Sequence, residues 1–137
     1  HKGPIIAVAG GTGLAPILSI IKYSQEIEMK QPTSIYYGAQ SEQELYFIEQ
    51  FHTMSKINKN LNFYPVIIEG SKNKILRQGF VTDAIVQDIK DFDGYKAYLA
   101  GPPKMVEAAE KILTNKGIRK VDMHSDAFYT PYEQMKE

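Results

Sequence analysis

A glycine-rich turn is the part of the sequence whose residue types indicate chemistry most directly. Gly10-Gly11-Thr12-Gly13 follows the apolar run Pro4 to Ala9, and Pro16 suits the first turn of a helix. Glycines between a strand and a helix let the backbone approach a phosphate closely. The helix N-terminus adds free N–H donors and a partial positive charge. The turn therefore predicts a phosphate-binding loop, although a tight turn without a ligand would use the same residues.

Two common phosphate-binding motifs do not fit this turn. The dinucleotide fingerprint G-x-G-x-x-G needs a glycine at its sixth position. If the motif is counted from Gly11, that position is Pro16. It also needs a carboxylate after the second strand, but that strand ends Tyr36 to Gln40 without one. A Walker A loop would require Gly-Lys-Ser/Thr, which is absent. We therefore expect phosphates to be bound by the backbone in another manner.

The elements that would position this loop alternate between strand and helix. Apolar runs and helical spacing predict five strands, at 4–9, 33–38, 61–68, 95–100 and 121–128, and helices after Pro16, after Ser41, over 80–89 and over 104–115. We predict a polar loop from Glu69 to Gln78, and we expect Pro65 to mark a sheet edge or a bulge. The pattern predicts an α/β fold, a doubly wound five-stranded parallel sheet with helices on both faces. Such sheets bind ligands at the carboxyl ends of their strands.

Two further predictions concern the helix expected at 104–115. Gly117 is expected to cap it, and Ala108 is expected on its inward face together with Met105, Ala109, Ile112 and Leu113. Met105 is interpreted as a core residue rather than a ligand contact.

Composition narrows the class of protein. The 137 residues carry 16 basic and 16 acidic side chains, so net charge gives no argument for nucleic acid. Cysteine is absent, which excludes disulfides and iron–sulfur ligation within these residues, and no histidine has a visible metal partner. No apolar stretch approaches the roughly 20 residues of a membrane span. We predict a cytoplasmic protein with no membrane partner and no metal site.

Several motifs, taken in order, resemble the ferredoxin–NADP reductase superfamily. The segment from Gly10 to Pro16, Ala15 included, resembles its pyrophosphate loop. Tyr37-Gly38-Ala39-Gln40 resembles its second-strand turn, Gly79-Phe80-Val81 matches the pattern after its third-strand loop, and Gly101-Pro102-Pro103-Lys104-Met105 resembles its turn beside the nicotinamide. The ending His124 to Tyr129 is most similar to reductase components of bacterial aromatic-ring dioxygenases and monooxygenases. The resemblance covers essentially the whole chain.

This resemblance implies a strand order of 3-2-1-4-5 and a nicotinamide-dinucleotide-binding domain of an oxidoreductase over residues 1–137, with the flavin domain absent. NADH is expected to deliver hydride to FAD, held by that other domain of the same protein. Electrons then pass to a ferredoxin, a 2Fe-2S domain or an oxygenase. The expected cofactor contacts are Gly10, Gly11, Thr12, Gly13, Ala15 and Pro16 at the pyrophosphate, Gly38, Ala39, Gln40 and Glu69 at the adenosine ribose, Gly101, Pro102 and Pro103 at the nicotinamide, and Phe128 towards the flavin. No residue is expected to act as a general acid or base.

Two departures from the family pattern keep alternatives open. Ala100 stands where the family often has cysteine, which leaves a non-catalytic NAD(P)-sensing module as the competing hypothesis. Gln40 stands where the family often has arginine, which favours NAD(H) over NADP(H). A stand-alone dehydrogenase is disfavoured because no catalytic dyad accompanies the loop.

Overall fold

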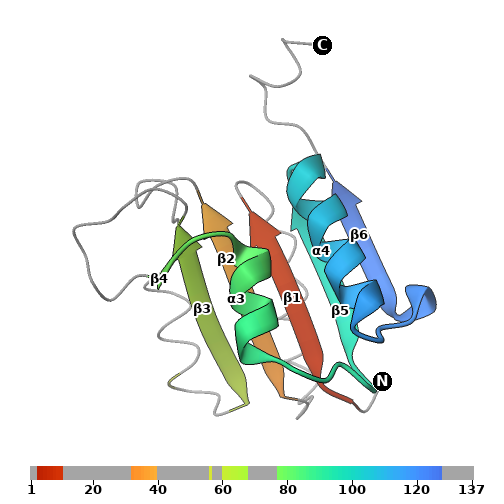
Figure 1. The fold of residues 1–137 in the computed structure, drawn as a ribbon. Helices are drawn as coiled ribbons and strands as arrows, with labels where there is room; N and C mark the ends of the chain where they lie inside the picture. Colours follow the sequence, from red (N-terminus) through yellow and green to blue (C-terminus); the bar gives the residue numbers. More distant parts are fainter. Residues whose placement is uncertain (1–2, 11–31, 40–55, 57–59, 68–76, 128–137) are drawn as a thin grey trace.

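The protein forms a parallel sheet with helices packed on it (Figure 1). The computed structural model describes residues 3–10, 32–39, 56, 60–67 and 77–127. Within these ranges six strands lie in the order β4-β3-β2-β1-β5-β6. They are β1 (Ile5–Gly10), β2 (Thr33–Ala39), β3 (Leu61–Ile67), β4 (Arg77–Gln78), β5 (Lys96–Gly101) and β6 (Met123–Ala127).

The five longer strands confirm the predicted sheet and its order. Without β4, the spatial order corresponds to 3-2-1-4-5 when the predicted strands are counted along the chain. The prediction of a loop up to Gln78 was wrong at its end, because Arg77 and Gln78 pair with Val66 and Ile67 as a sixth strand. β4 pairs only with Val66 and Ile67, so within the described part of the sheet no strand pairs with Pro65 on that side of β3, while Tyr37 of β2 pairs with it on the other. The N–H that proline lacks is therefore not needed for pairing with β4.

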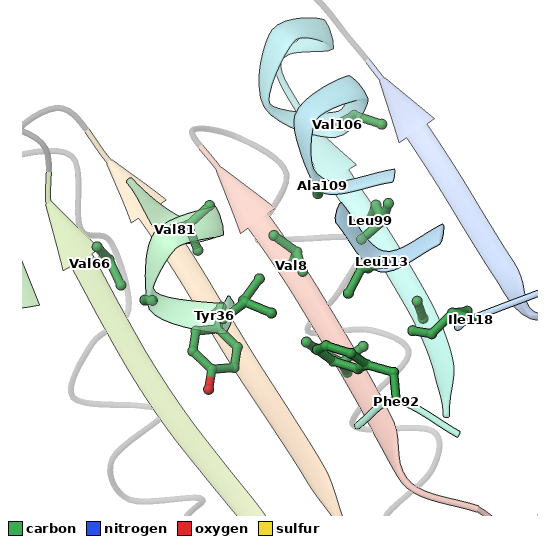
Figure 2. Close-up of a cluster of buried hydrophobic side chains, with 14 residues drawn as sticks. Val8, Tyr36, Val66, Val81, Phe92, Leu99, Val106, Ala109, Leu113 and Ile118 are labelled. Carbon is green, nitrogen blue, oxygen red and sulfur yellow. The ribbon is translucent and has the colours of Figure 1, made fainter. Parts of the chain in front are cut away.

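Helices α3 (Val81–Asp88) and α4 (Pro103–Asn115) lie side by side on one face of the sheet (Figure 1). Each buries an apolar stripe against the strands, which Figure 2 shows from the helix side. From α3 the buried residues are Val81, Ala84 and Ile85, and from α4 they are Val106, Ala109 and Leu113. They meet strand residues such as Val8 and Leu99, which are at most 1% exposed. This packing fixes where both helices begin, at the carboxyl edge of the sheet.

Strand β1 is buried along its whole length. Ile6 and Val8 face α3 and α4 in the core, and the intervening Ile5, Ala7 and Ala9 are at most 6% exposed. Successive side chains of a strand point to opposite faces, so β1 is covered on both. The helices predicted after Pro16 and after Ser41 lie outside the described residues.

The C-terminal end of α4 confirms the predicted glycine cap. Gly117 has φ of +108°, its N–H donates to the Thr114 carbonyl, and the N–H of Ile118 donates to the Leu113 carbonyl at 3.0 Å. These two bonds form a Schellman motif. Two smaller predictions nearby were wrong. Ala108 is exposed, because Val106 takes the inward position instead. Residues Lys120–Asp122 form a short 3-10 helix before β6 rather than the start of a strand.

Candidate functional site: the carboxyl edge of the sheet

The strand ends bring three predicted contact regions to one edge. All strands are parallel, and in Figure 1 the arrowheads of the long strands point to the same edge. At that edge Gly10 of β1 pairs with Gly38 of β2, and Gly101 of β5 pairs with Ala127 of β6. Since β5 also pairs with β1 up to Ala9, the ends of β2, β1, β5 and β6 form one continuous row. The predicted contacts at 10–16, 38–40, 101–103 and Phe128 lie at or directly after strand ends of this row in the sequence, whereas Glu69 follows β3, whose Ile67 pairs with Ala39.

The Gly101 turn leads directly into α4. Gly101 has φ of +154°, which residues with a side chain rarely adopt. Pro102 is the N-cap with φ of −58°, and Pro103 is the first helical residue. The prolines restrict the backbone, and the Pro102 carbonyl accepts hydrogen bonds at 3.1 Å from the N–H groups of Met105 and Val106. The two prolines thus start this helix and make the turn a stiff one.

The ends of β1 and β5 approach each other too closely for side chains. A Cβ on Gly101 would lie 2.9 Å from the Gly10 carbonyl oxygen and 3.1 Å from the Gly10 nitrogen. A Cβ on Gly10 would collide with the sulfur of Met105. The backbone of β1 therefore requires a glycine at Gly101, whereas a side chain on Gly10 would displace the flexible end of Met105.

A second contact holds the end of β2 to the start of α3. A Cβ on Gly38 would lie 3.2 Å from the Val81 Cβ, so Gly38 admits the helix. Gly79 precedes the helix with φ of +121°, and its N–H donates to the Ile67 carbonyl at 2.7 Å. Phe80, the N-cap of α3, is 59% exposed. This exposed aromatic ring lies beside the row of strand ends. It belongs to the Gly79-Phe80-Val81 pattern but is not among the predicted cofactor contacts.

No side chain of the remaining predicted contacts is described. Ala39 closes β2 with its backbone paired to Ile67, whereas its side chain is not described. Eight predicted contacts lie outside the described residues: Gly11, Thr12, Gly13, Ala15, Pro16, Gln40, Glu69 and Phe128. The structure therefore brings together the strand ends from which these segments continue.

Ala100 lies inside the sheet rather than at its surface. It is 2% exposed, and its backbone pairs with Ala9 on one side and Asp126 on the other. Its methyl group supplies no hydrogen bond and no titratable group. The described side chains of the Gly101 turn are therefore the two prolines and the exposed Lys104 in the first turn of α4. They can help to bind and orient a ligand.

Comparison with known proteins decides the family. Residues 7–111 match the oxidoreductase NAD-binding domain. The chain belongs to this family. The matched residues run from β1 to most of α4, so they include Gly10, Gly38 and the Gly101 turn. The resemblance to reductases of the ferredoxin–NADP reductase type is confirmed by the relatives below.

Curated relatives include a reductase component of naphthalene 1,2-dioxygenase and salicylate 5-hydroxylase systems from Ralstonia, 41% identical over 94% of this chain and 39% of the relative. A probable flavin reductase from Aliivibrio fischeri is 35% identical over 93% of this chain and 54% of the relative. Among solved structures, the Amycolatopsis cytochrome P450 reductase GcoB has a TM-score of 0.86 and 30% identity, over 93% of this chain and 38% of that one. The chain thus spans about two fifths to one half of these relatives.

Proposed function

We propose that the chain is the NAD(H)-binding domain of a flavin-dependent reductase, spanning residues 1–137, whose FAD is held by a separate domain of the same protein. The observation that carries the proposal is the row of strand ends, where Gly10, Gly38 and Gly101 lie together at the carboxyl edge of the sheet in a member of an NAD-binding family. The curated relatives named as reductase components extend well beyond the region that this chain matches. An additional flavin-binding domain is consistent with that extent.

The residues divide along the row according to the part of the dinucleotide they would hold. The loop from Gly10 through Gly11, Thr12 and Gly13 to Ala15 and Pro16 would bind the pyrophosphate by backbone N–H groups. The ends of β2 and β3, with Gly38, Ala39, Gln40 and Glu69, would border the adenosine ribose. Gly101, Pro102 and Pro103 would border the nicotinamide, and Phe128 would face the flavin.

The chemistry belongs to the cofactors: bound NADH supplies a hydride and FAD accepts it. The chain's own contribution would be orientation, because the stiff turn of Gly101, Pro102 and Pro103 would limit where the flat ring can rest. Ala100 supplies no proton donor there, and hydride delivery to a flavin needs none from this domain. We further propose that the electrons continue to an iron–sulfur acceptor, either a ferredoxin or a fused 2Fe-2S domain, or to an oxygenase.

The test is anaerobic reduction of the flavin in the full-length protein. NADH should bleach the FAD absorbance of the full-length protein as fast as the enzyme turns over. Residues 1–137, expressed separately, should bind NADH but retain no flavin and reduce almost no ferricyanide. Stoichiometric flavin on residues 1–137, with rapid NADH-dependent ferricyanide reduction, would contradict the proposal that a separate domain holds the FAD.

A non-catalytic NAD(P)-sensing module is the second candidate, and the buried Ala100 is the observation in its favour. It predicts nucleotide binding by the full-length protein with no flavin and no NADH oxidation. The same experiment therefore separates the two functions, and the Ala100→Cys variant refines it. If the family's thiol matters here, this variant should raise the rate of flavin reduction without changing NADH affinity.

A further inference from the structure

The buried hydroxyl of Tyr36 is bonded to the last residue of α3. Tyr36 lies in the middle of β2 and is 1% exposed, and its hydroxyl donates a hydrogen bond to Asp88 Oδ2 at 2.8 Å. The two residues are 52 positions apart in the sequence, so the bond joins the strand to the helix. The ring of Tyr64, from β3, stacks on that of Tyr36 with centroids 4.9 Å apart. This stacking fixes the direction in which the hydroxyl points.

The hydrogen bond gives α3 a second point of attachment to β2. At the carboxyl edge Val81, the first residue of α3, packs on Gly38. Tyr36 and Gly38 are two residues apart on one strand, so both face the same helix. In Figure 2 the Tyr36 hydroxyl points away from Val81, towards the other end of α3. One end of the helix is therefore held by side-chain packing and the other by a hydrogen bond.

Asp88 is poorly placed for the stability of the helix itself. As the last residue of α3 it puts a carboxylate at the negative end of the helix dipole, and no basic residue stands in that turn. Asp88 is also exposed, so burial of apolar surface does not explain it. A hydrogen-bond acceptor at this position is, however, what the buried Tyr36 hydroxyl requires. Asp88 therefore stabilises the junction of α3 with β2 rather than α3 alone.

We infer that Asp88 and Tyr36 are positioning residues for the adenosine end of the nucleotide site, because their hydrogen bond sets how far α3 lies along β2. A helix released from this bond and displaced towards the carboxyl edge would press Val81 into Gly38, where the spacing is already tight. The end of β2 would then move, and this is the strand end proposed to border the ribose. The inference rests on the proposed function and adds two residues that act through α3.

The first experiment measures AMP binding to the full-length protein by calorimetry, because AMP is the adenosine half of NAD. Losing the bond lowers the fraction of molecules whose helix is correctly placed, and the apparent affinity falls with that fraction. The net contribution of one hydrogen bond corresponds to about a 2- to 10-fold change in an equilibrium constant. Tyr36→Phe and Asp88→Ala should each weaken AMP binding by about this factor. Asp88→Asn keeps an acceptor oxygen and should bind AMP as wild type does.

Two further measurements follow the same variants. The double variant Tyr36→Phe/Asp88→Ala should bind AMP no more weakly than either single variant, because all three lack the same bond. In stopped-flow reduction of the flavin by NADH, the concentration that gives the half-maximal rate should rise by about 2- to 10-fold. The limiting rate should stay unchanged, because the nicotinamide end of the site is not displaced.

Ile85→Val is the matched control for a purely structural role. Ile85 is buried in the middle of α3, and its loss of a methylene destabilises the packing without removing the hydrogen bond. It should lower the urea midpoint and leave AMP affinity unchanged.

The outcomes separate the inference from the proposed function. If Tyr36→Phe and Asp88→Ala lose stability but bind AMP as wild type does, the inference is wrong while the proposed function stands. The inference is equally wrong if Ile85→Val weakens AMP binding as much as they do, because affinity would then follow stability alone. If the wild-type protein binds neither AMP nor NADH, the proposed function itself fails.

Discussion

Val81 packs directly on Gly38, with its Cβ 3.2 Å from the position that a Cβ on Gly38 would occupy. The contact joins the end of β2 to the start of α3, and its spacing is already tight. The packing therefore leaves little room for a side chain at Gly38, whether or not a ligand also approaches there. This predicts a coupling between the two residues that can be measured.

Gly38→Ala should lower the free energy of unfolding by about 1–3 kcal/mol, the usual cost of overpacking a core. Val81→Gly removes the obstructing Cβ together with both methyl groups, so the double variant should lose less than the sum of the two single losses. Urea unfolding of all four proteins measures the coupling. Strict additivity would mean that the helix moves aside without cost.

The sequence could predict most of the sheet because its strands are nearly continuous apolar runs. Ile5 to Ala9 is buried on both faces, which removes polar alternation and leaves a strong strand signal. The two-residue strand β4 could not be predicted, because Arg77 and Gln78 are polar and too few to show a period. Val121 suggested a strand by its branched side chain, yet it is 74% exposed in a 3-10 turn.

The candidate site was predictable only in part, for a related reason. Glycines and prolines at strand ends are visible in a sequence, and they gave Gly10, Gly38 and the Gly101 turn. The contact of Met105 with Gly10 depends on β5 lying next to β1, which is a property of sheet order. Helical spacing alone marks Met105 as an inward residue and says nothing about the strand end it covers.

Gly117 provides a test of backbone strain without steric overlap. A Cβ at this position would meet nothing within 4 Å, so the cost of a side chain comes from φ of +108° alone. Gly117→Ala should lower the free energy of unfolding by about 1–2 kcal/mol, and Gly117→Asn should cost less because asparagine tolerates such conformations. Lys116→Ala, at the preceding exposed residue, is the matched control and should change little in the same denaturation series. Equal effects of the Ala and Asn variants would argue against this account.

Tyr95 should make the protein sensitive to alkaline pH. Burial raises the pKa of Tyr95 above its ordinary value of 10.0, and the nearby Asp91 and Tyr64 add to the effect. The folded state therefore holds the phenol proton more tightly than the unfolded state. The stabilisation is complete below pH 10 and is lost as pH rises from there through the folded pKa. In thermal melts across this range, Tyr95→Phe should lose less stability than wild type; parallel losses would locate the sensitivity in other groups.

Phe128 tests the face towards the proposed flavin domain. It follows Ala127, whose backbone pairs with Gly101, so it continues from the strand end beside the proposed nicotinamide turn. In the full-length protein, Phe128→Ala should lower the rate of flavin reduction more than it weakens NADH binding, because the ring would order the reacting faces rather than hold the nucleotide. Stopped-flow absorbance of the flavin measures the rate, and Phe128→Tyr should preserve it. A variant that loses affinity with an unchanged limiting rate would place Phe128 in nucleotide binding instead.

The preference for NADH over NADPH tests the adenosine end of the site. A 2′-phosphate needs a matched cation, ideally the planar fork of arginine, and Gln40 stands at the position where that arginine is expected. Glu69, just beyond β3, would accept hydrogen bonds from ribose hydroxyls and repel an added phosphate. Lys72 and Lys74 follow Glu69 in the polar loop predicted from the sequence, and point charges exposed to water contribute about 1 kcal/mol or less. They should reduce the preference without reversing it.

Titration of the full-length protein with both cofactors at moderate salt should therefore show tighter NADH binding. Changing Lys72 and Lys74 together to alanine should widen the margin, whereas Glu69→Gln should narrow it by removing the repulsion. Gln40→Arg should improve NADPH binding most, because it supplies the missing bidentate partner. Equal or tighter NADPH binding that persists without the two lysines would show that the ribose lies elsewhere than between Gln40 and Glu69.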